Sequence, residues 1–418
     1  MRFMVPGIPH TVTSKEYCSC AYTQKVLKLC KMLKDRGHYV IHLGHERSEV
    51  ECDEHVTVTR DADLAAAYGS GEWRELMWKQ EGFKFDVNDS CYREFYGNAI
   101  GEIFKRKQPK DFLLCMWGHG HRAVADAHQD MIVVEPGIGY AGGHFAPFKV
   151  FESYALLHAY GGLKAVGEAG RLGNYEAVIP NYFDLADFDY EEKKGDYFLC
   201  LGRINVGKGV HIAIQACEAI GAKLVIAGQG HPSDIGYSGT GQPPLPDCVQ
   251  WVGFADVETR RKLIAGARGM FVLSQYVEPF GGVMIEAALS GTPVITTDWG
   301  AATENVLHGI TGFRCRTFEH ITWAARNIDR ISPRACRDWA AANFSMDRAA
   351  DQYEEFWRMV MDIHGGKGWY EPHDDRADLG WMTRSYPLAG TISADWSSAL
   401  RGEGSRLSSH PPLRLAGD

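Results

Sequence analysis

The candidate chemistry of this sequence begins in a glycine-rich loop that carries two cations. Arg203 and Lys208 stand five residues apart, shortly after a run of residues that predicts a strand. Two cations at this spacing can bind a diphosphate and neutralise the charge that grows as it leaves, and Gly202 lets such a ligand approach the backbone. The loop matches neither a Walker loop nor a GxGxxG dinucleotide turn. The alternative is a pair of ordinary surface charges.

A second segment places two carboxylates around the predicted start of a helix. Glu278 and Glu286 flank the pair Gly281-Gly282, and unobstructed backbone N–H groups at a helix start form an anion site. The carboxylates can then reach different parts of one ligand, with Glu278 on sugar hydroxyls and Glu286 on ribose hydroxyls. The alternative for Glu286 is a cap or an ion pair on a solvated helix face. Its apolar neighbours favour the functional interpretation, because a buried carboxylate needs hydrogen-bond partners.

Short strands alternate with helices through the first half of the chain. Apolar periodicity predicts a strand at 2–6, a helix at 21–35 that stops at Gly37, and a strand at 39–43. This succession is the βαβ signature of a parallel sheet. Two further apolar runs, at 112–116 and 131–134, fit the same sheet.

The second half repeats the alternation more cleanly. The sequence therefore predicts an α/β fold with two tandem parallel-sheet domains. Ligands of open α/β sheets bind at the carboxyl ends of the strands, so both candidate loops are well placed. Strands are predicted at 196–201, 223–227, 249–252, 269–273 and 293–296, and helices at 209–220, 258–267 and 282–290.

The composition indicates a globular chain. Of 418 residues, 45% are hydrophobic and 23% charged, and 44 Lys and Arg against 53 Asp and Glu leave a formal charge of −9. That balance argues against nucleic-acid binding through bulk charge. No stretch reaches the ~18 apolar residues of a membrane-spanning helix, and the apolar start is too short for a signal peptide. Eleven dispersed cysteines indicate free thiols in a reducing compartment, so we expect a soluble, cytoplasmic protein.

As a set, these motifs resemble the retaining nucleotide-sugar glycosyltransferases of the family-four group, which have the GT-B fold. The resemblance is dense over 179–315 and sparse before it. It implies two Rossmann-like domains that face each other across a cleft. The matching stretches are Gly202-Arg203 with Lys208-Gly209, the E-x7-E motif from Glu278 to Glu286, Ser-Gly-Thr-Pro-Val at 290–294, Ile-Pro-Asn-Tyr-Phe-Asp at 179–184 and Arg-Gly-His-Tyr-Val at 36–40.

The resemblance also implies domain boundaries. We expect an acceptor-side domain over 1–182 and a donor-binding domain over 183–350. A helix at 351–370 would return to the first domain, as the last helix does in this fold. The segment 371–418 is rich in Gly, Ser, Asp and Pro, so we expect a loosely ordered tail.

Catalytic and donor-binding roles follow from the same resemblance. Arg203 and Lys208 would hold the donor diphosphate and stabilise the leaving group, and Glu278 would contact the transferred sugar. Such enzymes are usually metal-independent, so we expect neither a metal nor another cofactor beside the nucleotide sugar. Further donor contacts would come from Gly202, Phe280, Gly281 and Gly282, from Glu286 on the ribose, and from Gly7 on the diphosphate.

One departure concerns the first domain. Members of the family commonly place a His just after a strand of this domain, in contact with the transferred sugar. Here the strand at 131–134 runs into Glu135, with no His at that place. Possible sugar or acceptor contacts are therefore His119, His121, Glu135 and His144. His119 and His121 could also suggest a metal, but their spacing alone is weak evidence.

The hypothesis is a retaining glycosyltransferase, a hexosyltransferase that moves a sugar from a nucleotide-diphosphate donor such as UDP-glucose to an acceptor hydroxyl. One rival of the same fold is a sugar-nucleotide isomerase or phosphorylase. Another is a non-catalytic nucleotide-sugar-binding module. The sequence leaves the acceptor open.

Aromatic and basic residues at 73–110 allow a nucleic-acid acceptor, such as a hydroxylated base in DNA. The near-neutral first domain argues against this minority idea, because phosphate contacts dominate such affinity. The segment 74–107 could line an acceptor groove or cap the first sheet. The basic run 105–110 is better interpreted as the last turn of a helix.

Overall fold

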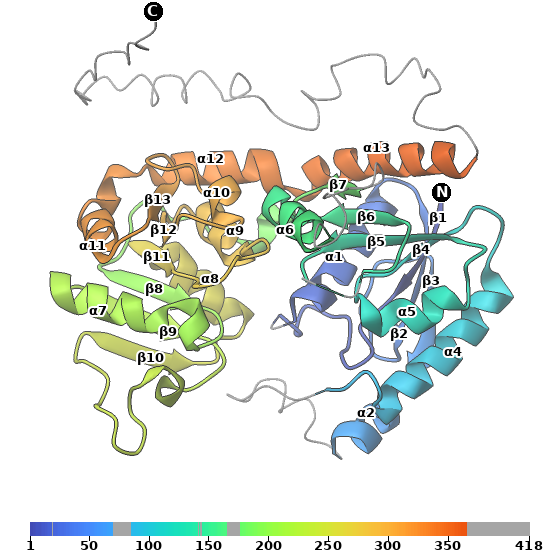
Figure 1. The fold of residues 1–418 in the computed structure, drawn as a ribbon, viewed down its shortest axis with the longest axis horizontal. Coiled ribbons are helices and arrows are strands. Elements are labelled where there is room, and N and C mark those ends of the chain that lie inside the picture. The colour runs from blue at the N-terminus through green and yellow to red at the C-terminus, as the bar shows by residue number, and fades with distance from the viewer. Residues whose placement is uncertain (19, 70–84, 141, 143, 165–175, 366–418) are drawn as a thin grey trace, which may run out of the picture. The chain divides into compact units, whose positions relative to one another are not determined.

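The computed structural model describes residues 1–18, 20–69, 85–140, 142, 144–164 and 176–365. These residues form two α/β lobes, each built on a parallel sheet (Figure 1). We call residues 1–182 together with the last helix the first lobe, and residues 183–344 the second lobe. Both belong to one compact unit. The predicted fold class is confirmed, and the predicted tail at 371–418 lies outside the described residues.

The first lobe has a seven-stranded sheet in the order β3-β2-β1-β4-β5-β6-β7, and neighbouring strands pair in parallel. Helices follow most of the strands, as parallel pairing requires. The strands are β1 Arg2–Pro6, β2 Tyr39–His45, β3 Glu54–Thr59, β4 Phe112–Leu114, β5 Ile132–Ile138, β6 Phe148–Phe151 and β7 Glu176–Val178. The helices are α1 Ala21–Asp35, α2 Asp61–Tyr68, α4 Ser90–Arg106, α5 His119–Asp126 and α6 Tyr154–Lys164.

Both faces of this sheet are buried. Side chains alternate across a strand, so Phe3 and Val5 pack under α1 whereas Met4 packs under α4 and α5. A central strand covered on both sides explains why β1 consists almost entirely of apolar residues. The last turn of α4 carries Lys105 and Arg106, which confirms the interpretation of the basic run.

The second lobe has a six-stranded parallel sheet in the order β10-β9-β8-β11-β12-β13. Its strands are β8 Tyr197–Leu201, β9 Lys223–Ala227, β10 Val249–Gly253, β11 Gly269–Val272, β12 Val294–Thr297 and β13 Gly312–Cys315. Its α-helices are α7 Val210–Ile220, α8 Val257–Gly266, α9 Gly282–Leu289, α10 Ala302–Asn305, α11 Phe318–Arg326 and α12 Pro333–Phe344. Short 3₁₀ turns occur at Leu185–Asp187, Val206–Lys208, Pro232–Ile235 and Ile328–Arg330.

The last helix, α13 Met346–His364, packs on the first sheet. Figure 1 shows it continuing from α12 and lying along the first lobe. Its Trp357 ring lies 5.3 Å from the Phe3 ring and 5.5 Å from the Phe112 ring, centroid to centroid. At the crossing, the Phe183 N–H donates to the Phe344 carbonyl and the Met346 N–H to the Phe183 carbonyl. Two chain crossings between the lobes are therefore tied together.

Candidate active site

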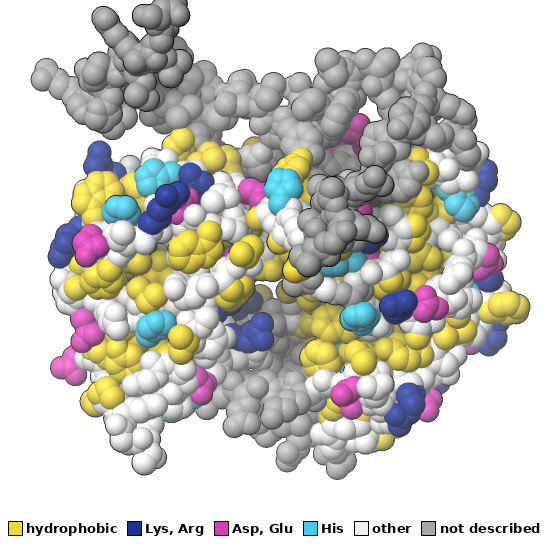
Figure 2. Space-filling view, in the orientation of Figure 1, with side chains coloured by type: hydrophobic (Ala, Val, Ile, Leu, Met, Phe, Trp, Pro, Cys, Tyr) yellow, Lys and Arg dark blue, Asp and Glu magenta, His cyan; other side chains and the backbone are white. Residues whose placement is uncertain are grey.

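A cavity of about 720 Å³ lies between the lobes and is lined by residues of both. On the face drawn in Figure 2 the surface is hollowed between the lobes. The second lobe contributes the loops after β8, β9 and β11 and the start of α9, at the carboxyl ends of its strands. The first lobe contributes one face of α1 and the loops after β5 and β6. Both candidate loops of the sequence therefore meet in one cleft.

The loop after β8 is shaped by a side-chain cap and a glycine. Asn205 Oδ1 accepts the Lys208 N–H at 3.0 Å and closes the 3₁₀ turn that orients Lys208. Gly209 has φ +68°, and a Cβ there would lie 2.2 Å from the Leu273 carbonyl oxygen. Only glycine allows this approach, which brings Lys208 against the loop after β11. Arg203, in contrast, is exposed and lines the cleft.

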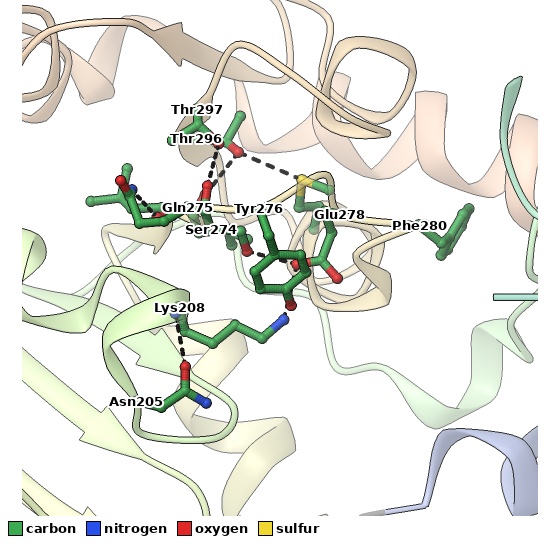
Figure 3. Close-up of polar contacts among 12 residues, drawn as sticks. Asn205, Lys208, Ser274, Gln275, Tyr276, Glu278, Phe280, Thr296 and Thr297 are labelled. Atoms are coloured by element: carbon green, nitrogen blue, oxygen red, sulfur yellow. Dashed lines mark hydrogen bonds and ion pairs between the residues drawn. The ribbon is translucent and has the colours of Figure 1, made fainter. Parts of the chain in front are cut away.

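Lys208 and Glu278 form an ion pair across these two loops. The Lys208 Nζ lies 2.9 Å from Glu278 Oε2, which also accepts the Ser274 hydroxyl at 2.6 Å. In Figure 3, Lys208 extends toward Tyr276 and Glu278. Burial lowers the pKa of Lys208, but Glu278 and Tyr276 outweigh burial and leave the pKa above its ordinary value. Lys208 is therefore a cation at neutral pH.

The start of α9 presents backbone N–H groups at the cleft. Gly281, with φ +71°, precedes the helix, and both Gly281 and Gly282 line the cavity. The first N–H groups of a helix lack partners within it, so they can bind an anion. The Phe280 side chain points away from Lys208 and Glu278 (Figure 3) and is buried against Phe183 and Phe344. Its contribution to a ligand is therefore limited to its backbone.

Glu286 lines the cleft but already has a partner. The Arg260 guanidinium of α8 lies 2.6 Å from Glu286 Oε2 and also donates to the Cys18 carbonyl of the first lobe at 3.5 Å. Glu286 in turn raises the pKa of Arg260 above its ordinary value. Arg260 precedes Glu286 by 26 residues and lies outside the E-x7-E motif, so the motif gave no sign of this partner.

His121 holds the loop after β1 at Gly7. The His121 Nε2 donates to the Gly7 carbonyl at 2.9 Å, and the imidazole stacks on Phe95. Burial lowers the pKa of His121 to about 4, so the ring is neutral. A Cβ on Gly7 would lie 3.0 Å from the Thr13 hydroxyl. Neither residue lines the cavity in the described part of the chain.

Glu135 lies inside a strand and not in a loop after it. β5 continues to Ile138, and Glu135 is fully buried. Its carboxylate accepts the Tyr140 hydroxyl and the N–H groups of Phe145 and Ala146, all at 2.9 Å. These three bonds use the carboxylate to shape the following loop. Among the residues that the structure describes, Glu135 does not line the cavity, which corrects its expected position.

The two remaining histidines are also outside the cavity lining of the described chain. His144 Nε2 donates to the Tyr140 carbonyl at 3.0 Å and stacks on the Tyr140 ring. His119 is exposed at the start of α5. Among the described residues, neither His119 nor His121 belongs to a group of three or more possible metal ligands.

Several cleft residues of the first lobe were absent from the sequence-based prediction. Tyr22, Lys25 and Lys28 line the cavity from α1, and Glu152 lines it from the loop after β6. The three-residue spacing of Lys25 and Lys28, which places both on one side of α1, was a usable signal. Glu152, the partner of Lys25, had no such signal in the sequence. The two residues lie far apart along the chain, and only the fold of the first lobe brings them into contact.

One group of side chains in the described residues has metal-ligand geometry. His45, Glu46 and Asp61 offer atoms within 4.8 Å of one another. However, Asp61 also pairs with Arg47 at 3.2 Å, and Glu46 accepts the Asp61 N–H at 2.9 Å. These contacts hold Asp61 at the start of α2, so they explain why the three side chains lie together. The cluster is outside the cleft lining.

Residues 184–334 match the family described as glycosyl transferases group 1. Most of the second lobe is therefore similar to a group 1 glycosyltransferase domain. An uncharacterized glycosyltransferase of Methanocaldococcus jannaschii, MJ1607, is 30% identical over 200 residues, 44% of this chain and 49% of that protein. A glycogen synthase of Mycobacterium tuberculosis is 35% identical over 147 residues, 33% of this chain and 35% of that protein.

The chain thus matches half or less of these curated relatives, and the likeness centres on the group 1 glycosyltransferase domain. Solved structures extend the likeness to the fold of both lobes. AviGT4, a glycosyltransferase involved in avilamycin A biosynthesis, has a TM-score of 0.60 at 19% identity, over 86% of this chain and 98% of that chain. Sucrose-phosphate synthase from Thermosynechococcus elongatus has a TM-score of 0.60 at 16% identity, over 87% and 100%. These similarities show the GT-B architecture.

In the described residues, no helix combines the length and apolar character needed to cross a membrane.

Proposed function

We propose that the chain is a retaining glycosyltransferase that moves a sugar from a nucleoside-diphosphate donor to an acceptor hydroxyl. The observation that carries the proposal is the convergence, in one cleft, of Arg203, the Lys208–Glu278 pair and the start of α9. Two cations and free backbone N–H groups suit a diphosphate, and a carboxylate beside them suits sugar hydroxyls.

In the proposed reaction, Arg203 and Lys208 neutralise charge on the departing diphosphate. This stabilises the transition state more than the ground state, because the charge grows as the bond breaks. The acceptor hydroxyl attacks the anomeric carbon, the bond from that carbon to the phosphate oxygen breaks, and the hydroxyl proton passes to the leaving phosphate. Attack on the face that the phosphate leaves retains the anomeric configuration.

We further propose UDP as the nucleotide and no metal requirement. The Anabaena protein HepE, whose structure has been solved with UDP-glucose, shares the fold with a TM-score of 0.56 at 17% identity, over 85% of this chain and 98% of that chain. The two cations and the helix start supply positive charge where a divalent ion would otherwise act. Glu286 would meet the ribose while keeping its contact with Arg260.

A thermal-shift panel tests the proposal. The full chain is heated with UDP, GDP and ADP, and with their glucose, mannose and N-acetylglucosamine conjugates, each with and without EDTA. At 100 times its dissociation constant a ligand adds about 2.7 kcal/mol to the free energy of unfolding. We expect a shift with the UDP compounds that survives EDTA. Silence from every compound on folded protein would contradict the proposal, and conversion of a donor without any acceptor would favour the isomerase or phosphorylase.

A further inference from the structure

A buried ion pair on the first lobe lines the cleft opposite the group 1 domain. Lys25 lies on α1 and Glu152 follows β6, and their relative exposures are only 3% and 5%. The Lys25 ammonium and Glu152 Oε1 are in direct contact. Both residues nevertheless line the cavity. A buried pair at a cavity wall is costly to desolvate, so its position calls for a reason.

Neighbouring residues are shaped around this pair. The Lys25 Nζ donates to the Gly137 carbonyl at 3.2 Å and lies 4.3 Å from the centre of the Tyr22 ring. Gly139 leaves room for the carboxylate, because a Cβ there would lie 2.5 Å from Glu152 Oε2. The pair is therefore held in one place by the end of β5, by the residue that follows it and by α1.

The Glu152 carboxylate keeps unused acceptor capacity. An ionised carboxylate offers about four lone-pair sites. Within the described chain, Oε1 is buried and has no hydrogen-bond partner beyond its contact with Lys25. Glu135, a buried carboxylate of the same lobe, accepts three hydrogen bonds. An acceptor left unmet at a cavity wall is satisfied when a ligand brings a donor.

The position of Glu152 relative to the second lobe indicates which ligand atom is the donor. The hydroxyl of Ser153, the next residue, donates to the Pro279 carbonyl across the lobes at 2.5 Å. Glu152 directly precedes Ser153, and Glu278 directly precedes Pro279. The two carboxylate residues therefore flank the hydrogen bond that joins the lobes. Because Lys25 neutralises Glu152, the pair suits a neutral hydroxyl and not a phosphate.

We propose that Glu152, held by Lys25, accepts a hydrogen bond from a hydroxyl of the transferred sugar and so positions the sugar from the first lobe. This inference rests on the proposed function, in which Glu278 contacts the same sugar from the second lobe. The nucleotide itself makes no contact with Glu152. The sugar part of the donor alone should therefore respond to a change at residue 152.

The test is calorimetric titration of the full chain with UDP, UDP-glucose, UDP-galactose and UDP-N-acetylglucosamine. For Glu152→Gln we expect the dissociation constant for UDP to stay within twofold of the wild type. The constant for the UDP-sugar that the wild type prefers should rise about tenfold, as expected for one lost hydrogen bond to a charged group. Asp111→Asn is the matched control. Like Glu152, Asp111 is a buried carboxylate in an ion pair, with Arg2 at 3.1 Å, but it is not among the residues that line the cavity in the described chain. This variant should change neither constant.

Glu152→Gln leaves Lys25 without its partner and could unfold the lobe, so the double variant Lys25→Met/Glu152→Gln is titrated as well. We expect the same selective loss. An unchanged preference for the UDP-sugar over UDP in either folded variant would overturn the inference and leave the proposed function standing. Equal weakening of UDP and UDP-sugar would also overturn it. A wild type that binds none of the four compounds would overturn both.

Discussion

Arg203 and Lys208 hold their charges in different ways. In the described part of the chain, the Arg203 side chain has no ion pair or hydrogen bond and is exposed. Lys208 is committed to Glu278 and lies 5.0 Å from the centre of the Tyr276 ring. A diphosphate would therefore gain Arg203 freely but would share Lys208 with Glu278. Both cations would contact the diphosphate, so replacing either should weaken UDP binding. Only the replacement of Lys208 should also lower the free energy of unfolding.

We expect Arg203→Ala and Lys208→Ala each to raise the dissociation constant for UDP by about 10- to 100-fold, the value of one charge-assisted contact. Arg203→Ala should leave the melting temperature unchanged. Lys208→Ala should lower the free energy of unfolding by about 1 kcal/mol, because Glu278 loses its charged partner and keeps the Ser274 hydroxyl. Calorimetry and thermal melts measure both, with the exposed Lys193→Ala as control. UDP affinity equal to that of the control would remove these cations from the site.

His121 makes stability depend on pH. Burial lowers its pKa from 6.5 to about 4. Between these values the unfolded chain binds a proton at this residue and the folded chain does not, so stability falls as the pH drops from 6.5 to 4. His121→Gln keeps a donor for the Gly7 carbonyl but cannot titrate. Denaturant unfolding at pH 4.5 and 7 should show a smaller acid loss in the variant, and an equal loss would contradict the assignment.

At the scale of elements, the two ends of α7 compare a glycine in a tight site with one in open space. Gly209 and Gly221 flank the helix with nearly equal φ values of +68° and +67°. A Cβ on Gly209 would strike the Leu273 carbonyl, whereas a Cβ on Gly221 would meet nothing within 4 Å. A substitution at either glycine would therefore strain the left-handed backbone, but only a substitution at Gly209 would also cause a steric clash.

We expect Gly221→Ala to cost about 1 kcal/mol of unfolding free energy from the left-handed backbone. Gly209→Ala should cost more, because the loop that carries Lys208 must move away from β11. That movement should also weaken UDP binding, which Gly221→Ala leaves intact. Denaturant unfolding and calorimetry on both variants make the comparison. If Gly209→Ala and Gly221→Ala lose the same stability and bind UDP equally well, the loop that carries Lys208 accommodates the added methyl group, and the expected clash is absent.

At the scale of the whole molecule, the lobes are joined by polar contacts around the cleft as well as by the chain crossings. The Glu304 carboxylate of the second lobe accepts the N–H groups of Tyr154 at 2.9 Å and Ala155 at 2.7 Å. It therefore caps α6 of the first lobe, beside the bond from Ser153 to Pro279. Opening the cleft must break these bonds, so they favour the closed arrangement.

We expect Glu304→Ala to lower the free energy of unfolding by about 1 kcal/mol, as the loss of a helix cap does. Hydrogen exchange at the amides of Tyr154 and Ala155 should become faster, because their acceptor is gone. Glu319→Ala, at the first turn of α11 within the second lobe, is the control and should leave these two amides unchanged. Unchanged exchange in Glu304→Ala would show that the cap does not hold the lobes.

The sequence carried more information about the second lobe than about the first. Strands β8 to β12 and helices α7, α8 and α9 were predicted to within one or two residues, because apolar periodicity and glycine turns are local signals, whereas β13, α10, α11 and α12 were not predicted. In the first lobe, β3, β6 and β7 were not predicted, since short strands beside irregular loops have weak periodicity. β5 was predicted too short, so Glu135 was expected in a loop and lies in the sheet.

By itself, the sequence determined the fold class and the cluster of Arg203, Lys208, Glu278 and the glycines of α9, because each of these lies in a short motif. Only the tertiary structure decided which side chains meet. Arg260 beside Glu286, and Lys25 beside Glu152, come from separate elements, and no local pattern encodes their pairing. Burial decided the rest: it made His121 a support for Gly7 and left Glu152, at the cavity wall, with an acceptor to offer.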